Sequence, residues 1–312
     1  MRVIRNLALQ PSAAQSAVLT LGNFDGVHRG HQSLVARTLA LAGEHKSAAG
    51  VVLFEPHPSE FFAPDRAPAR LSSLAQKLGR LRHCGLDFVV VLRFDQQLAQ
   101  MAAPDFVRKI LCARLGMRGL LIGDDWRFGR DRAGDFALLC ELQEACGYVV
   151  RRLDTVLADD QRISSSRIRA CLAARQVEQA NALLGRCWAV VGRVVAGAQL
   201  GRTLGAPTAN IHYRRALPLG MGVYMCWLDG RPAVANYGTR PTVDGGQPML
   251  EVHVLDQQLA LYNRRVTVEF GGFLRPEQRF ADLEALREQI HKDMHQARQW
   301  HRSNPYQRMP CA

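Results

Sequence analysis

The stretch from Ala17 to His31, AVLTLGNFDGVHRGH, constrains the fold more than any other part of this 312-residue chain. Its first five residues are apolar and partly β-branched, which predicts a buried strand. Gly22 to Gly26 predicts a tight turn, and apolar residues after His31 repeat at helical spacing. A strand, a glycine turn and a helix start predict an anion site, because the first amides of a helix lack internal partners and its dipole favours negative charge.

Two histidines, His28 and His31, lie three residues apart in this turn. If the helix begins near His28, both imidazoles share one face and reach the bound anion. Imidazoles there can donate hydrogen bonds to phosphate oxygens as charge develops in a transition state. The alternative is an N-capping turn with two exposed histidines. Further residues of matching type around the pair favour the functional interpretation.

Alternating strands and helices continue to about residue 153. The expected strands are 48–54, 87–94, 119–122 and 148–153, and the expected helices are 71–84, 104–115 and 134–146. This alternation predicts a Rossmann-like parallel sheet with helices on both faces. Ligands of such folds bind beyond the carboxyl ends of the strands. The turns at 22–31, 55–58 and 123–129 each follow an expected strand, so they should share that rim.

The stretch Ile163 to Arg169, ISSSRIR, places three hydroxyls before a periodic apolar pattern. This is an N-cap signal, and a plain helix cap is the simpler interpretation. Two arginines at the same helix start favour polyphosphate binding, because hydroxyls, free amides and guanidinium groups together bind it well. A helical stretch, 170–184, follows.

The pattern changes after Gly185. Six short β-type runs separated by Gly and Pro predict a small antiparallel β-barrel: WAVVGRVV, TANIHY, GVYMCWL, AVANYG, LEVHVL and RVTVEF. An amphipathic helix is expected at 280–298. The sequence therefore predicts an α/β domain at 1–185 and a β-barrel domain with a terminal helix at 186–312.

A second chemical stretch, 197–210, is rich in glycine and contains Arg202, which is typical of a loop that closes over phosphates. Thr208 and Asn210 are two apart in a strand-like run, so both oxygens point the same way and suit magnesium held with nucleotide phosphates. The alternative is a β-turn followed by a barrel strand. Glu251 alternates with apolar neighbours, as a solvent-facing strand carboxylate does, and His253 shares its face.

Composition excludes some classes of function. Forty Lys and Arg against 28 Asp and Glu give a net charge of +12, which suits anionic partners, and arginines spread along the chain favour nucleotides over nucleic acid. No apolar run approaches a membrane span and the N-terminus lacks a signal-peptide pattern, so we expect a cytoplasmic protein without a membrane partner. Eight cysteines without a C-x-x-C motif give no support for zinc or a disulfide framework. His291 and His295 flank Asp293 on the last helix; a solvated face is favoured over a metal site there, because no third ligand is evident.

Several motifs carry a resemblance to known families. His28-Arg29-Gly30-His31 matches the H-x-G-H motif of the nucleotidyltransferase superfamily. Its I-S-S-T-x-x-R motif is matched at 163–169, with Ser166 where Thr is usual. Residues 54–58 and 123–129 resemble the F-x-P-H-P and G-x-D-F-R-F-G stretches of the FAD synthetase module, with Trp126 in place of Phe.

The second half resembles riboflavin kinases. The stretch 197–210 matches their signature G-x-x-x-G-R-x-L-G-x-P-T-A-N, with Ala206 in place of a frequent Phe. Asn263 stands where the family usually has Gly, and Asn tolerates the same left-handed backbone. Taken together, the chain resembles the family of bifunctional bacterial riboflavin kinases/FAD synthetases.

The resemblance implies two reactions. The barrel moves the γ-phosphoryl of ATP to riboflavin, and the α/β domain joins AMP from ATP to FMN to give FAD, with Mg²⁺ in both. The implied catalytic residues are His28, His31, Arg169 and Glu251, and the implied metal ligands are Thr208 and Asn210. The implied ATP-binding residues are Gly22, Phe24, Asp25, Gly30, Ser164, Ser165, Arg169, Gly201, Arg202, Gly205 and Thr208. The implied flavin-binding residues are Asn23, Pro56, His57, Asp125, Trp126 and Phe128.

Two alternatives stay open at this point. In the first, only one module is catalytically active; the departures at Trp126, Ala206 and Asn263 motivate it. In the second, the chain is a basic nucleic-acid-binding protein; the net charge and the small barrel motivate it. The sequence does not predict the oligomeric state.

Overall fold

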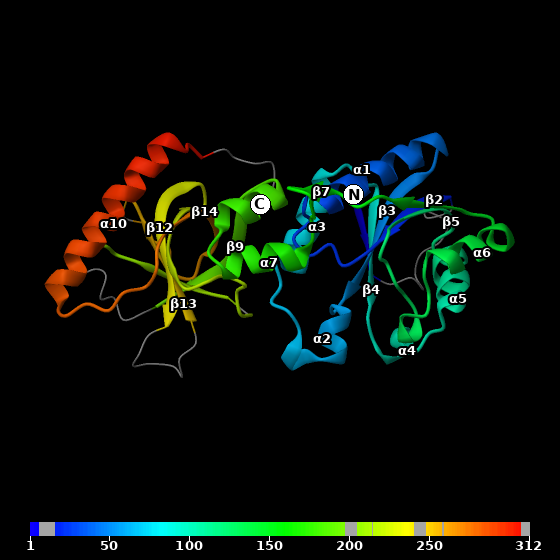
Figure 1. Cartoon of the computed structure of the whole chain (residues 1–312), viewed down its shortest axis with the longest axis horizontal. Helices are drawn as coiled ribbons and strands as arrows, with labels where there is room; N and C mark the ends of the chain where they lie inside the picture. The colour runs from blue at the N-terminus through cyan, green and yellow to red at the C-terminus, as the bar shows by residue number, and fades with distance from the viewer. Residues whose placement is uncertain (6–15, 197–204, 214, 240–247, 258, 307–312) are drawn as a thin grey trace. The chain divides into compact units, whose positions relative to one another are not determined.

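The computed structural model describes residues 1–5, 16–196, 205–213, 215–239, 248–257 and 259–306 (Figure 1). Its internal contacts divide the chain into two compact units. The first contains Met1–Pro68 and Leu74–Ile163, and the second contains Ala69–Ser73 and Ser164–Ala312.

The first unit is built on a six-stranded sheet in the order β1-β4-β3-β2-β5-β6, with every neighbouring pair parallel. Its strands are β1 (Arg2–Ile4), β2 (Ala17–Leu21), β3 (Ala48–Glu55), β4 (Phe88–Arg93), β5 (Met117–Gly123) and β6 (Val149–Leu153). The predicted parallel sheet is confirmed. Strand β1 is the exception that sequence periodicity missed, because three residues are too few to show a period.

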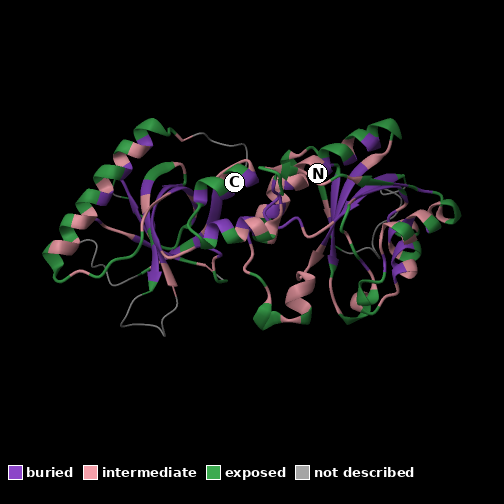
Figure 2. Ribbon diagram, viewed as in Figure 1, coloured by how far each residue is buried: buried purple, intermediate pink, exposed green. Residues whose placement is uncertain are grey.

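Helices cover both faces of this sheet, as expected (Figures 1 and 2). Leu34 and Leu41 of α1 and Leu81 of α3 belong to the core on one face. Leu111 of η3 and Leu139 of α6 belong to the core on the other. The helical segments are α1 (Arg29–Glu44), α2 (Pro58–Phe62), η2 (Pro64–Arg66), α3 (Leu74–His83), α4 (Gln96–Ala99), α5 (Ala103–Asp105), η3 (Phe106–Cys112), η4 (Arg130–Arg132) and α6 (Phe136–Cys146).

Two details of the first unit differ from the expectation. The single helix expected at 104–115 is a short α5 followed by η3, which has π-helical hydrogen bonding. A small hairpin, β7 (Leu157–Ala158) and β8 (Gln161–Arg162), follows β6. Hydrophobic spacing does not distinguish a π-helical turn from an α-helical one over so few residues.

The second unit begins with two helices, α7 (Ser165–Ala173) and α8 (Val177–Leu184). The continuous helix expected at 170–184 is therefore wrong, since Arg175 adopts a left-handed backbone with φ +66° between the two. Asn181 fastens α8 to the barrel: its Nδ2 donates to the carbonyl of Phe270 at 2.9 Å, and its Oδ1 accepts the backbone N–H of Trp188 at 2.7 Å.

A closed antiparallel barrel forms the rest of the second unit, in the order β10-β13-β12-β11-β14-β9. The strands are β9 (Trp188–Val195), β10 (Ala209–His212), β11 (Gly222–Leu228), β12 (Arg231–Thr239), β13 (Pro248–Val254) and β14 (Arg265–Arg275). Tyr224 and Phe270 are fully buried in it, and Figure 2 shows the buried residues along the strands. The predicted barrel is confirmed.

The terminal helix, α10 (Leu283–Ser303), covers part of the outer surface of the barrel. Ala297 packs there against Met225 and Leu255. The solvated face predicted for the last helix is confirmed for His291 and His295, which are exposed, but wrong for Asp293. Asp293 is 4% exposed, because Arg275 reaches it from β14.

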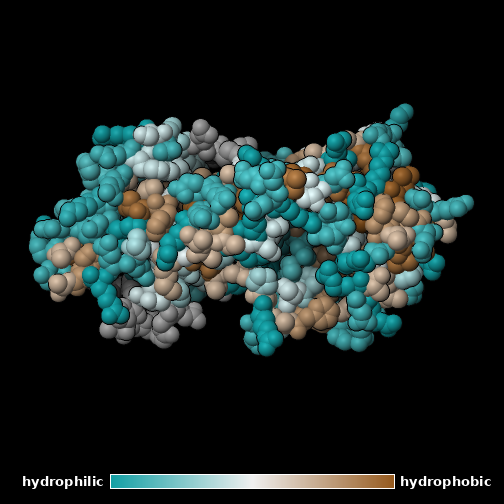
Figure 3. Space-filling view, in the orientation of Figure 1, coloured by the Kyte–Doolittle hydropathy of each residue, from teal (hydrophilic) through white to brown (hydrophobic). Residues whose placement is uncertain are grey.

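Among the described residues, every helix is too short or too polar to cross a lipid bilayer. On the face shown in Figure 3, hydrophobic side chains lie in separate patches between hydrophilic ones. The apolar side chains of the two units lie mostly in the cores described above.

Candidate active sites

The turn between β2 and α1 has an unusual backbone. Phe24, Gly26 and Val27 all have positive φ, at +47°, +83° and +43°. This region is rare for a β-branched residue such as Val27 and persists only where the surroundings enforce it. Here Val27 N–H donates to the Phe24 carbonyl at 3.1 Å, Gln32 Nε2 donates to the Val27 carbonyl at 2.9 Å, and the Phe24 ring is fully buried. The turn is therefore a fixed platform at the head of α1.

His28 and His31 lie together on this platform. Their rings stack with centroids 3.6 Å apart and planes 18° apart. His28 is the N-cap of α1, and its Nδ1 accepts the backbone N–H of His31 at 3.3 Å. A Cβ on Gly30 would lie 3.2 Å from that Nδ1, so glycine leaves room for the ring. Because Nδ1 accepts, the proton of the neutral His28 ring is on Nε2.

The other predicted turns of the first unit share one rim of the sheet. Strands β2, β3 and β5 are mutually parallel, so the turns that follow them leave from the same edge. Pro56 and His57 follow β3, and His57 is the N-cap of α2, with its Nδ1 accepting the Ser59 N–H at 3.1 Å. The predicted common rim is confirmed by the strand directions.

The turn after β5 carries an aromatic pair. Trp126 and Phe128 stack with ring centroids 4.6 Å apart and planes 15° apart. Phe128 is buried, whereas Trp126 is partly exposed. Asp125 is exposed and accepts a hydrogen bond from Arg162 at 2.7 Å. Trp126 thus presents a flat apolar surface, which is what a planar ring system needs for stacking.

Lys77 is a residue of this region that sequence reasoning missed. It is 2% exposed, and its Nζ donates to the backbone carbonyl of Asn23 at 3.1 Å. A buried ammonium is costly unless it is hydrogen-bonded. The signal was present in the sequence, because Lys77 falls among Leu74, Leu78 and Leu81 on the apolar face of α3.

Ser164, Ser165 and Arg169 belong to the second unit by their contacts. Ser164 is the N-cap of α7 and accepts the backbone N–H of Arg167 at 3.2 Å, as the helix-cap interpretation predicts. Arg169 donates from Nε to the carbonyl of Ala69 at 2.6 Å. The start of α7 is therefore a capped helix N-terminus, where the helix dipole favours anions.

The barrel brings the predicted kinase residues into register. Glu251 of β13 is paired with Asn210 of β10 on one side and Asn236 of β12 on the other. Leu250 and Val252 are buried in the barrel, so Glu251 points to the outer surface. Asn210 is 4% exposed and Glu251 is half-buried.

Thr208 precedes β10 and follows Gly205, where φ is +78°. The carbonyl of Pro207 lies 2.9 Å from Nδ1 of His253. Burial lowers the pKa of His253 below its ordinary value. Gly201 and Arg202 lie outside the described residues. Asn263 has φ +62°, which confirms that Asn adopts the left-handed backbone predicted there.

The oxygen atoms near β10 suit a magnesium ion that arrives with a nucleotide. Among the described residues there is no group of three or more His, Cys, Asp or Glu side chains that could hold a metal ion. Thr208 and Asn210 supply a hydroxyl and an amide oxygen, and Mg²⁺ commonly takes its remaining ligands from phosphates and water.

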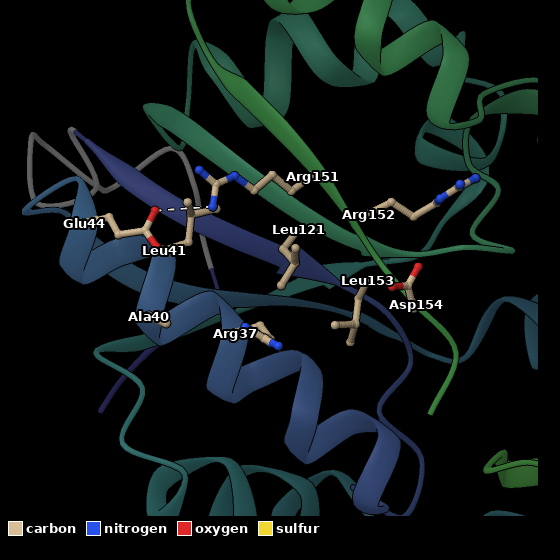
Figure 4. A pocket seen from close by; sticks show the side chains of 9 residues that line it. All are labelled: Arg37, Ala40, Leu41, Glu44, Leu121, Arg151, Arg152, Leu153 and Asp154. Carbon is tan, nitrogen blue, oxygen red and sulfur yellow. Dashed lines mark hydrogen bonds and ion pairs between the residues drawn. The ribbon is translucent and has the colours of Figure 1, made fainter. Parts of the chain in front are cut away.

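A hollow of about 210 Å³ lies between α1 and β6 in the first unit (Figure 4). Its lining residues are Arg37, Ala40, Leu41, Glu44, Leu121, Arg151, Arg152, Leu153 and Asp154. Arg151 and Glu44 form an ion pair across it at 3.3 Å. None of the nine is a predicted site residue.

Comparisons with known proteins identify two families along the chain. The chain matches the FAD synthetase family over residues 10–167 and the riboflavin kinase family over residues 184–301. It is 43% identical to the bifunctional riboflavin kinase/FMN adenylyltransferase of Escherichia coli (strain K12), covering 96% of both chains. It is 46% identical to the protein of that name from Pseudomonas fluorescens, covering 96% of this chain and 97% of the relative.

A solved structure extends the likeness to the fold. The crystal structure titled macrolide-efflux protein from Streptococcus pneumoniae matches with a TM-score of 0.85 at 26% identity, covering 96% of this chain and all of that one. The family models and the two relatives agree with each other and with the geometry of both units. The chain belongs to the family of bifunctional riboflavin kinases/FMN adenylyltransferases.

Proposed function

We propose that this chain phosphorylates riboflavin to FMN with ATP and then adenylylates FMN to FAD with release of pyrophosphate. The observation that carries the proposal is the presence of two phosphate-directed groups of residues in one chain. One is the stacked His28–His31 pair at the head of α1, and the other is the Asn210–Glu251 register on the barrel. We place the functional division near Gly185, with adenylylation assigned to 1–185 and phosphorylation to 186–312. Contacts alone group α7 and α8 with the barrel.

In adenylyl transfer, a phosphate oxygen of FMN attacks the α-phosphorus of ATP, and the bond to the bridging oxygen of pyrophosphate breaks. His28 and His31 donate hydrogen bonds to the reacting phosphates, where negative charge builds up. The proton on Nε2 of His28 supports this role, since its Nδ1 is taken by the helix cap. Among the predicted nucleotide contacts, Gly22, Phe24 and Asp25 belong to this turn, and Gly30 lies in the first turn of α1.

Ser164, Ser165 and Arg169 are proposed to bind the phosphates of this ATP. They lie at the N-terminal end of α7, whose amides and dipole favour an anion.

The flavin ring of FMN is assigned to the rim after β3 and β5. Trp126 and Phe128 offer stacked aromatic surface, and Asn23, Pro56, His57 and Asp125 supply the polar and rigid surroundings. Tryptophan in place of the family's phenylalanine keeps a flat apolar face of larger area.

In phosphoryl transfer, the 5′-hydroxyl oxygen of riboflavin attacks the γ-phosphorus of ATP, and ADP leaves with the electrons of the broken P–O bond. Glu251 accepts the hydroxyl proton. Its place in the ladder supports this role, because it lies in register with Asn210, a proposed magnesium ligand, on the neighbouring strand. Gly201, Arg202, Gly205 and Thr208 are proposed to contact the nucleotide.

Magnesium is proposed to enter with ATP and to be held by Thr208 and Asn210. It neutralises the phosphate charge that develops during transfer. The proposed ligands of the protein are few, so the affinity for metal depends on the nucleotide being bound.

A chromatographic time course with riboflavin, ATP and Mg²⁺ tests the proposal. We expect the wild type to make FMN and then FAD. His31→Ala should accumulate FMN, with adenylylation slowed about 100- to 1,000-fold. Glu251→Gln should slow phosphorylation about 100-fold or more and still convert supplied FMN to FAD.

The rival with one active module predicts a different result. The wild type would then perform one of the two steps and bind the other flavin without converting it. Loss of both steps in both variants would mean a shared site or a folding defect, and the residue roles above would be withdrawn.

A further inference from the structure

His253 has a contact that the two proposed chemistries do not account for. It lies on β13 two residues from Glu251, on the same face of the strand. It is 9% exposed, and its register partner on β12 is Val234. It is therefore a nearly buried imidazole beside the proposed kinase site.

The hydrogen bond of His253 defines its tautomer. Its Nδ1 lies 2.9 Å from the carbonyl oxygen of Pro207. A carbonyl oxygen only accepts, so Nδ1 carries the proton and donates. Its Nε2 is buried and has no hydrogen-bond partner among the described residues. The ring is thus placed for the Pro207 contact, at the cost of leaving its other nitrogen unsatisfied.

The carbonyl that His253 holds belongs to the residue before Thr208. Asn210 lies within β10 and is fixed by ladder pairing to β13 and β9. Thr208 precedes β10 and has no such pairing. Pro207 lacks an N–H, so its carbonyl is its one backbone group that can be held by a hydrogen bond. The His253 bond therefore fixes the backbone that leads into Thr208.

We propose that His253 is a positioning residue for phosphoryl transfer: it holds the Pro207 carbonyl so that the Thr208 hydroxyl and the Asn210 amide face the same magnesium–nucleotide complex. This inference rests on the proposed kinase function. It concerns the backbone before β10, and His253 itself contacts neither metal nor substrate.

His301 provides a matched control. It is also a buried histidine on the barrel, 8% exposed, with its Nε2 3.2 Å from the carbonyl of Ala233. Ala233 lies inside β12 and has no link to Thr208. A merely structural histidine–carbonyl bond is thus available for comparison in the same unit.

The experiment uses the full-length chain with His253→Asn, His253→Gln, His253→Leu and His301→Leu. The amide nitrogen of Asn can take the place of Nδ1, whereas that of Gln falls nearer Nε2. Two quantities are measured: the KM for Mg²⁺ in riboflavin phosphorylation, and the Mg²⁺ concentration at half-change of riboflavin fluorescence when ADP is present. The second requires no turnover, and riboflavin lacks the phosphate needed for adenylylation.

We expect Leu and Gln at position 253 to raise both Mg²⁺ values about tenfold, with a smaller change in kcat at saturating Mg²⁺. His253→Asn should stay within about threefold of wild type, and His301→Leu should leave both values unchanged. FMN adenylylation should be unchanged in all four.

Equal Mg²⁺ values for Asn and Gln at position 253, or an equal rise in His301→Leu, would overturn the positioning role. If His253→Leu does not fold, the Asn and Gln pair still decides the question. If the wild type makes no FMN, the proposed kinase function is refuted. The positioning role is judged from the variants, so the two failures are distinguishable.

Discussion

A capping histidine and a catalytic histidine need not be alternatives. His28 and His57 both accept a backbone N–H at Nδ1 as helix N-caps, which places the ring proton on Nε2. His253 has the opposite tautomer, because its Nδ1 faces a carbonyl. The backbone contact of each histidine therefore decides which nitrogen can donate or accept. For His28, its role as helix N-cap leaves the proton on Nε2, and this is the tautomer that can donate a hydrogen bond to phosphate.

The second unit should lose stability in mild acid because of His301. Burial lowers the pKa of His301 below 6.5, its ordinary value, since the ring packs against Trp227 and Trp300. The unfolded chain then binds the proton more readily than the folded chain. The stability from the neutral ring is complete above pH 6.5 and is lost as the pH falls through the lowered pKa.

We therefore expect the urea concentration at the unfolding midpoint to decrease as the pH is lowered from about 7.5 to about 5.5. Tryptophan fluorescence follows the unfolding. His301→Phe removes the titrating group and should reduce this fall, although it lowers the midpoint at neutral pH by removing the bond to Ala233. A variant with the same pH dependence as wild type would show that other groups are responsible.

Single residues differ in how far the sequence reveals them. The turn around His28 was predictable, because its glycines and following apolar spacing fix a strand-turn-helix locally. Asn263 was predictable from its tolerance of positive φ. The burial of Asp293 was not predictable, because its partner Arg275 is 18 positions earlier and meets it only when α10 packs on the barrel. Lys77 was visible as a charge on an apolar helix face, but its target, the Asn23 carbonyl, required the fold.

At the level of elements, Gly192 allows β9 and β10 to close the barrel. A Cβ at this position would lie 2.3 Å from Cγ2 of Ile211 and 2.6 Å from the carbonyl oxygen of His212. Gly192→Ala should therefore lower the free energy of unfolding of the second unit by about 1–3 kcal/mol, measured by urea denaturation. FMN adenylylation at permissive temperature should be unaffected.

Gly79 gives the matched control for that substitution. It lies in α3, and nothing is within 4 Å of a Cβ placed there. Gly79→Ala should raise stability by about 0.5–1 kcal/mol, because alanine has the higher helix propensity. Equal effects of the two substitutions would contradict the steric explanation for Gly192.

Removing only one partner of the ion pair between β14 and α10 should strongly destabilise the second unit. Arg275 Nη2 lies 2.7 Å from Asp293 Oδ2, and its Nε donates to the same carboxylate at 2.8 Å. The two side chains are 15% and 6% exposed. Arg275→Met alone should destabilise by about 3–5 kcal/mol, because it leaves a buried carboxylate without its cation.

The double variant Arg275→Met, Asp293→Leu should recover much of this loss, since no unpaired charge remains. A double-mutant cycle by urea denaturation measures the coupling. Additive losses would indicate that the two side chains stabilise α10 independently.

Elements were predictable where a period extends over enough residues. Strands β2 to β6 and the barrel strands show alternation or apolar runs that survive in the fold. No glycine or proline predicts the break between α7 and α8, where Arg175 adopts the left-handed backbone. The π-helical η3 shares its apolar spacing with an α-helix. The hydrogen-bonding pattern and tertiary contacts determine both the helix break and the π-helical turn, and local periodicity predicts neither.

At the scale of the whole molecule, one chain carries two consecutive reactions, and the product of one is the substrate of the other. The residues proposed for FMN formation lie in the second unit, and the stacked histidines proposed for FMN consumption lie in the first. With the two reactions assigned to different residues, FMN must leave the kinase site before it is adenylylated. The intermediate can then pass between different protein molecules.

Mixing two variants, each of which has lost a different step, tests this directly. Full-length His31→Ala should convert riboflavin to FMN and stop, and full-length Glu251→Gln should convert only FMN to FAD. Their mixture, supplied with riboflavin, ATP and Mg²⁺, should make FAD after a lag in which FMN accumulates, and the lag should shorten as the His31→Ala protein is increased. Chromatography of the flavins over time measures this. If the mixture makes no FAD although each variant performs its own step, FMN does not reach solution, and the two sites must exchange it within one molecule.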